Sequence, residues 1–182
     1  KVFTFAGKEV ADPEGLTSAC IAKYNGNGEE QWAVTMEGGA LVYALDTDED
    51  GTLYAAGNFM DAVKYTGTDG TTGELAGGAD VYTAFVAKIS KDGAIEGIKT
   101  FAPVVNSAIM ESFMYFPEPG YVYVTPNNIK IDGEKVYVSA TYTADVEELG
   151  WKATYLNVFD FMYMENKSAG IFSLNKNDLS NP

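Results

Sequence analysis

Short apolar stretches separated by polar turns follow one another along most of the chain. Many of these stretches carry β-branched and aromatic side chains, which is typical of strands in a pleated sheet. Helix-forming residues dominate no long window. The pattern predicts strands at residues 1–7, 18–25, 31–36, 42–45, 53–57, 83–90, 95–101, 129–131, 136–140 and 168–175.

One of these strands occurs in three copies. Residues 18–25 read S-A-C-I-A-K-Y-N, residues 83–90 read T-A-F-V-A-K-I-S, and residues 168–175 read, more loosely, S-A-G-I-F-S-L-N. Each copy leads into a polar turn of Asn, Asp, Gly, Ser or Lys residues, several of which readily adopt the positive φ angles of hairpin turns. A second strand follows the turn in the first two copies, so each of these predicts a hairpin.

A second hairpin alternates with the first. It spans residues 42–57 and returns at residues 129–140. Two hairpins make a four-stranded unit, and such units must stack on one another to bury their faces. The prediction is an all-β, β-propeller-like array of four-stranded antiparallel blades with long inserted loops. Residues 1–182 would form a single domain, or part of one, with about three blades' worth of strands.

The two hairpins together resemble a known repeat. The stretch A-F-V-A-K-I at residues 84–89 with Asp92-Gly93, alternating with D-G-T-L-Y-A-A-G at residues 50–57, resembles the bacterial extracytoplasmic β-propeller repeat. That repeat reads A-F-V-A-K-L…D-G and then D-G-N-V-Y-V-x-G, and the match covers about half of the chain. The resemblance implies a secreted or outer-membrane surface protein of a Gram-negative bacterium, such as a gut-bacterial lipoprotein, and names no activity.

The third copy departs from this repeat. Gly170 stands where the pattern has Phe, and Ser173 stands where it has Lys. Three insertions, at residues 58–82, 102–127 and 144–167, separate the predicted hairpins. We expect them to be long loops, the first of them a Gly- and Thr-rich loop or ribbon.

The net charge of the chain excludes some classes of binding partner. Twelve Lys and Arg residues against 26 Asp and Glu residues give a net charge of −14, which disfavours nucleic acid and anionic membranes. There is no apolar run of about 18 residues and hence no transmembrane segment. No signal segment begins the sequence, so we expect any signal peptide to have been removed.

The acidic turn at residues 46–51, D-T-D-E-D-G, is a candidate metal site. Asp46, Asp48 and Asp50 have the spacing of the first ligands of a calcium loop. The rest of that pattern fails, because Tyr54 and Gly57 stand at the ninth and twelfth positions. Two interpretations stay open, a calcium site and a solvated hairpin turn; otherwise no cofactor is expected.

The insertions contain many aromatic residues. Tyr and Trp side chains on loops stack on sugar rings and anchor protein partners, but they also pack between blades. Under the first interpretation the chain binds a glycan or a protein partner at the cell surface. The candidate ligand-binding residues are Trp151, Tyr155, Phe161, Tyr163, Tyr115 and Tyr121.

Catalysis has few candidates in this sequence. The chain has no His, the commonest general base, and its one cysteine, Cys20, lies in an apolar strand as a packing residue. Acidic residues occur in or near the insertions, without the spacing of a defined pair: Glu111, Glu118, Asp145, Glu147, Glu148, Asp160 and Glu165. We therefore expect no catalytic residue.

Three functions are compatible with these features of the sequence. The leading hypothesis is a non-catalytic binding or scaffolding module, secreted or on the cell surface, that engages a glycan, a peptide or a partner lipoprotein. The alternatives are a carboxylate-dependent glycan-active enzyme and a purely architectural propeller segment. In the architectural case, copies self-associate or the chain joins further blades of the same protein.

Overall fold

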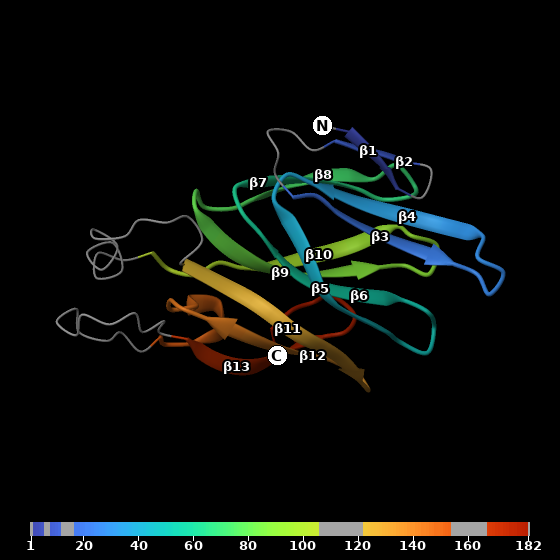
Figure 1. The fold of residues 1–182 in the computed structure, drawn as a ribbon. Helices are drawn as coiled ribbons and strands as arrows, with labels where there is room; N and C mark the ends of the chain where they lie inside the picture. Colours follow the sequence, from blue (N-terminus) through green and yellow to red (C-terminus); the bar gives the residue numbers. More distant parts are fainter. Residues whose placement is uncertain (1, 6–7, 12–16, 106–121, 154–166, 182) are drawn as a thin grey trace.

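A computed structural model describes residues 2–5, 8–11, 17–105, 122–153 and 167–181 of the chain (Figure 1). These residues form an all-β structure, as predicted. The strands are β1 (Val2–Phe5), β2 (Lys8–Ala11), β3 (Ala19–Tyr24), β4 (Glu30–Glu37), β5 (Ala40–Thr47), β6 (Leu53–Phe59), β7 (Ala62–Thr66), β8 (Thr72–Ala76), β9 (Val81–Ile89), β10 (Ile95–Phe101), β11 (Val122–Asp132), β12 (Lys135–Tyr142) and β13 (Ser168–Asn175).

Strands β5, β6, β9 and β10 lie side by side in that order, each antiparallel to the next. The two predicted hairpins therefore do combine into a four-stranded unit. Their turns are closed by glycines in the left-handed region, Gly51 with φ +84° and Gly93 with φ +86°. A side chain at such a φ is strained, which explains why glycine ends both turns.

A second sheet has the order β3-β4-β7-β8. Strands β7 and β8 come from the insertion at residues 58–82, where a loop or ribbon was expected. They form a hairpin, and β7 pairs with β4 through Thr66, Tyr65 and Lys64. The insertion thus extends the sheet next to the one that contains β6 and β9. Strands β1 and β2 form a separate two-stranded sheet.

Strands β11, β12 and β13 form an antiparallel ribbon. The ribbon joins the β5-β6-β9-β10 unit at one point, where Val122 and Tyr123 of β11 pair in parallel with Val81 and Tyr82 of β9. Beyond that point it packs across the face of the unit, so that Figure 1 shows β11–β13 as a layer below β6 and β9. Strand β11 begins at Val122, within the range of the second predicted loop, residues 102–127.

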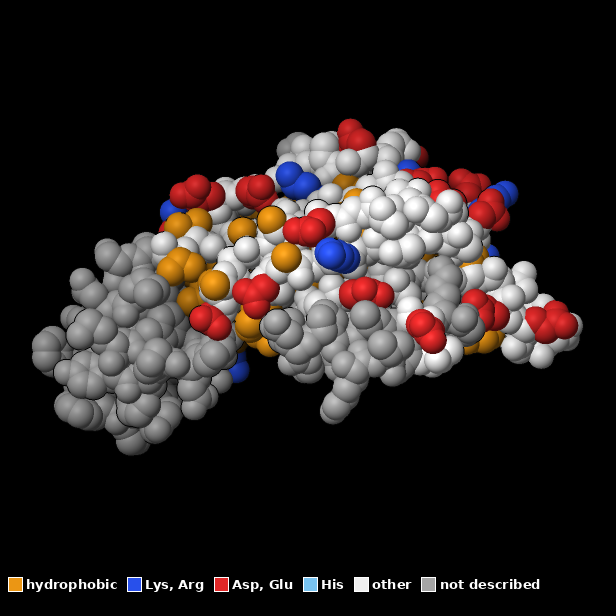
Figure 2. All heavy atoms as spheres, turned by 90° about the horizontal axis from the view of Figure 1, so that it is seen from above, with side chains coloured by type: hydrophobic (Ala, Val, Ile, Leu, Met, Phe, Trp, Pro, Cys, Tyr) orange, Lys and Arg blue, Asp and Glu red, His pale blue; other side chains and the backbone are white. Residues whose placement is uncertain are grey.

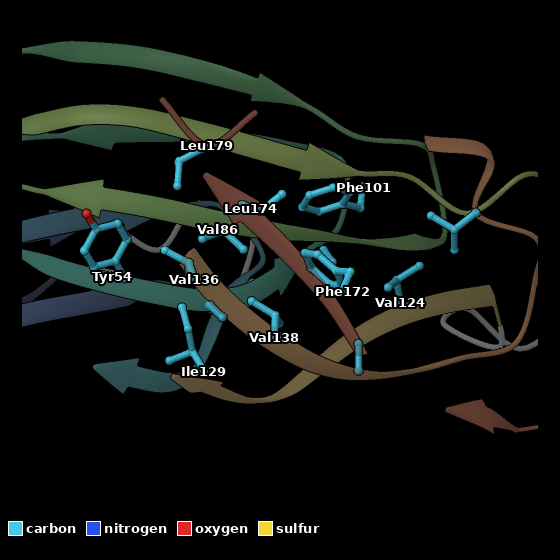
Figure 3. Packing of buried hydrophobic residues seen from close by; sticks show 14 of the residues in the cluster. Tyr54, Val86, Phe101, Val124, Ile129, Val136, Val138, Phe172, Leu174 and Leu179 are labelled. Carbon is cyan, nitrogen blue, oxygen red and sulfur yellow. The ribbon is translucent and has the colours of Figure 1, made fainter. Parts of the chain in front are cut away.

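Two apolar cores lie on opposite faces of β6 and β9. One contains Tyr54, Ala56, Ala84 and Val86 and packs against β11–β13 (Figure 3). The other contains the intervening residues of the same strands and packs against β3, β4 and β7. Because side chains alternate along a strand, every described side chain of β6 is buried. This strand is the centre of a three-layered structure.

Equivalent hairpins have β-bulges at equivalent positions of their hydrogen-bond ladders. In β3–β4 the ladder skips Gln31, and in β9–β10 it skips Glu96, the residue at the same place in the aligned copies. In β5–β6 it skips Tyr43, and in β11–β12 it skips Asn127, again at the same place. A β-bulge re-aims the strand that contains it, so the paired hairpins bend alike.

None of the helices in the described ranges has the length and apolarity that crossing a bilayer requires.

Candidate functional site

Trp151, the one described member of the aromatic candidates, lies at the end of the β11–β13 layer. It follows a short 3-10 helix, Glu147–Leu149, and its ring stacks on Tyr142 at 4.7 Å between centroids. Its edge meets Phe172 at 5.7 Å. A large part of this indole is therefore engaged in packing.

Trp151 also explains one departure of the third repeat copy. A Cβ atom built on Gly170 would lie only 2.6 Å from the indole ring of Trp151. The equivalent residue of the second copy is Phe85, which is fully buried. In the third copy, therefore, glycine stands in place of Phe, and the ring of Trp151 occupies the space beside it.

The other aromatic candidates, Tyr115, Tyr121, Tyr155, Phe161 and Tyr163, lie outside the described residues. The same holds for Glu111, Glu118, Asp160 and Glu165. Asp145 is described, and its carboxylate accepts hydrogen bonds from the Lys152 ammonium group and the Ala153 amide, both at 2.8 Å. This arrangement pins the segment that contains Trp151.

A shallow, open concavity of about 310 Å³ borders Trp151. It follows the edge of β13, because it touches three consecutive residues whose side chains point to alternate faces. Its described lining is Glu148, Leu149, Trp151, Ile171, Phe172, Ser173 and Asn181. The walls combine apolar side chains with three polar groups, the Glu148 carboxylate, the Ser173 hydroxyl and the Asn181 amide.

The outer face of β12 and β13 is the second feature of this end of the molecule. Tyr137 is 38% exposed and Ile171 is 71% exposed. Their equivalents in the β5-β6-β9-β10 unit are Tyr54 and Val86, which are 1% and 0% exposed. The same positions are thus buried where another layer covers them and exposed on this outer face.

The β3–β4 layer, at the opposite end of the stack, also exposes a residue whose equivalent in the middle layer is buried. Tyr24 of β3 is 49% exposed, whereas the equivalent Ile89 of β9 is 1% exposed. Ile89 faces the core shared with β3 and β4. Each end of the stack therefore exposes an apolar residue at a position that is buried in the middle layer.

The acidic turn between β5 and β6 is held by protein contacts. Asp46 accepts hydrogen bonds from the Ile131 amide at 2.8 Å and from Lys130 at 3.0 Å. Burial opposes ionisation of Asp46, but these hydrogen bonds outweigh it and hold its pKa below the usual value. Asp46 thereby ties β5 to β11.

The neighbouring carboxylates do not join it in a common site. Asp48 accepts hydrogen bonds from the amides of Asp50 and Thr52, which close the turn, and Asp50 is exposed. Across the described ranges, the structure brings together no group of three or more His, Cys, Asp or Glu side chains that could hold a metal ion. The described geometry is that of a hairpin turn.

Two buried polar groups lie near the centre of the fold. The Tyr54 hydroxyl donates to the carbonyl of Lys176 at 3.0 Å. Burial, and then the charges of Asp48, Glu96 and Glu134, raise its pKa to about 12. Asn58 is 2% exposed and donates to Thr125 at 2.9 Å, while its side-chain oxygen is buried without a hydrogen bond from a described residue.

On the face of the molecule that Figure 2 shows, the acidic side chains are scattered rather than gathered in one patch. Figure 2 shows Asp and Glu side chains scattered over the face seen from above Figure 1, with few Lys side chains between them. On the outer face of β12 and β13, Tyr137, Ser139, Ile171 and Ser173 are uncharged, and the exposed Lys135 lies at the start of β12. Covering the uncharged side chains of this face costs less desolvation than covering charged ones.

Tyr137 and Ile171 are not among the candidate residues that the sequence indicated. One signal was present, because the third copy differs from the others at Gly170 and Ser173. No comparison with protein-family models or with curated protein sequences finds a match for this chain. The site is therefore defined by its geometry alone.

Proposed function

We propose that this chain is a non-catalytic binding and scaffolding module, made of stacked β-units like propeller blades, and located on the outside of a bacterial cell. The observation that carries the proposal is the exposure of Tyr137 and Ile171 at positions that are buried in the middle layer. The outer face of β12 and β13 exposes residues at the positions by which the middle layer packs against its neighbour, so it is suited to pack against a further unit of the same kind.

The contacts between layers support such stacking. Residues of one layer donate to turn carbonyls of the next: the Trp32 indole donates to Lys91 at 2.8 Å, and the Tyr54 hydroxyl donates to Lys176 at 3.0 Å. In stacked repeats, each unit contacts its neighbours and depends on them for burial. The exposed Tyr24 at the other end offers a complementary partner surface, so the association would be head to tail.

The chemistry of the concavity supports a binding rather than a catalytic role. Its described lining includes one carboxylate, Glu148, whereas glycoside hydrolysis uses two facing carboxyl groups. The absence of His from the sequence removes the commonest general base. A glycan-active enzyme is therefore the less favoured alternative.

The test is the mass of the protein in solution. We expect sedimentation velocity to show concentration-dependent association of the wild type, which Ile171→Lys abolishes by burying an unpaired charge in the contact. Leu45→Lys is the matched control, because Leu45 is 51% exposed on β5 and is not part of this face. A wild type that stays monomeric at every concentration contradicts the proposal.

Binding of glycans or peptides through the aromatic insertions is the second part of the proposal. It is supported by the number of aromatic residues in those segments and requires its own test. A glycan array and a pulldown from outer-membrane extract should give specific binding without turnover. Negative results in both experiments would remove this part.

A further inference from the structure

Within the described part of the chain, one edge of strand β13 is unpaired. It pairs with β12 along its whole length, from Ser168 to Asn175, and no strand of the described residues pairs with its other side. The equivalent strand, β9, is flanked on both sides, by β6 and by β10. An unpaired edge presents amide and carbonyl groups that can pair with an added strand.

The concavity lies along this edge. Among its lining residues are Ile171, Phe172 and Ser173, whose equivalents in β9 are Val86, Ala87 and Lys88. In β9 those residues pair with Lys99, Ile98 and Gly97 of β10. The concavity therefore occupies, next to β13, the place that β10 occupies next to β9.

The turn that follows each strand strengthens this correspondence. After β9, the Ser90 amide donates to Ala94 at 2.8 Å, and after β13 the Asn175 amide donates to Ser180 at 2.9 Å. Asn181 then donates to the carbonyl of Glu148 at 2.8 Å. Both residues line the concavity.

We propose that the edge of β13 left unpaired by the described residues binds an extended peptide strand, antiparallel to β13. The inference rests on the proposed equivalence of the stacked units. Backbone hydrogen bonds to β13 supply the pairing, as in other cases of β-strand addition. Apolar side chains of the strand contact Leu149 and Trp151, and a neutral or basic strand suits both Glu148 and the net charge of −14.

The natural probe is a synthetic peptide with the sequence of residues 94–101, A-I-E-G-I-K-T-F, which includes β10. The chain has two tryptophans, so Trp32→Phe leaves Trp151 as the sole reporter. We expect saturable changes in Trp151 fluorescence on titration with this peptide. A scrambled peptide of the same composition should produce none.

Two further peptides separate strand addition from apolar adhesion. They carry N-methyl groups on alternate residues, one set on the odd and one on the even positions. Only one set of amides faces β13 in a paired strand, so one peptide should lose binding at least tenfold and the other should retain most of it. Equal behaviour of the two peptides would overturn the proposal.

Hydrogen exchange on the wild-type protein gives a readout that does not need the Trp32 variant. Binding should slow the exchange of alternate amides between Ser168 and Asn175. Binding without such protection, or no binding of the β10 peptide at all, contradicts the inference. Either result leaves the solution-mass test of the outer face unaffected, so failure of the edge and failure of the stacking proposal are distinguishable.

Discussion

The ammonium group of Lys88 donates a hydrogen bond to the carbonyl of Asn177, which lies in the turn after β13, at 3.1 Å. Lys23, its equivalent in the first copy, donates in the same way to the carbonyl of Lys91 in the turn after β9, at 3.2 Å. A lysine at one position of the copy thus links each layer to the turn of the next. The third copy has Ser173 at this position.

Removing these links should destabilise the protein unequally. Lys88 is also paired with Glu96 at 3.0 Å, and its side chain is 18% exposed, whereas Lys23 is exposed. We expect Lys88→Met to lower the free energy of unfolding by about 1 kcal/mol, and Lys23→Met to lower it by roughly half a kcal/mol or less. Urea denaturation of both variants measures this order, and the reverse order would contradict the linking role of Lys88.

Gly170 should not tolerate a side chain, because Trp151 covers it. We expect Gly170→Ala to cost about 1–3 kcal/mol through overpacking. Gly97→Ala, on β10, is the control, since nothing lies within 4 Å of its added Cβ and its φ is not positive. In a Trp151→Ala background the cost of Gly170→Ala should disappear. A double-mutant cycle from thermal unfolding measures the coupling, and additive costs would show that the two residues do not interact.

The raised pKa of Tyr54 predicts a loss of stability at alkaline pH. Its folded pKa of about 12 lies above the ordinary value of 10.0, so the unfolded chain releases this proton first. The stabilisation is complete below pH 10 and is lost as pH rises towards 12. The difference in unfolding free energy between wild type and Tyr54→Phe should therefore shrink over this range. A constant difference would place the hydroxyl in a more exposed setting.

Asp46 predicts the opposite dependence at acid pH. Its pKa is lowered in the folded protein, so its contribution is present above the ordinary value near 3.8 and is lost as pH falls through the lower folded value. Asp46→Asn should flatten the acid limb of the stability curve. Thermal melts of both proteins across that range test this, and parallel curves would contradict it.

Calcium should leave the melting temperature unchanged. The carboxylate of Asp46 accepts hydrogen bonds from Ile131 and Lys130, and Asp48 accepts two amides of its own turn. A specific ion would have to displace these partners, and a site that binds only the folded state must raise the melting temperature. Melts with calcium, with magnesium as control and after chelation settle the point. A rise specific to calcium would restore the metal interpretation of Asp46, Asp48 and Asp50.

The sequence by itself determined where most strands and turns lie. Gly51 and Gly93 fix hairpin turns because their backbone conformations are costly for other residues, and the alternation around them selects strands. These are local effects, carried by residues within a few positions of one another. They also made the equivalence of β9 and β13 visible from the sequence.

Only the tertiary structure decided which strands became neighbours and which faces stayed open. Backbone amide and carbonyl groups form the same hydrogen bonds whatever the side chain, so the sequence of β7 does not specify β4 as its partner. The packing of the whole fold selects this pairing. The packing of Trp151 over Gly170 joins positions from separate strands and segments for the same reason. Exposure of Ile171 likewise depends on whether another layer covers β13, which its own residues do not encode.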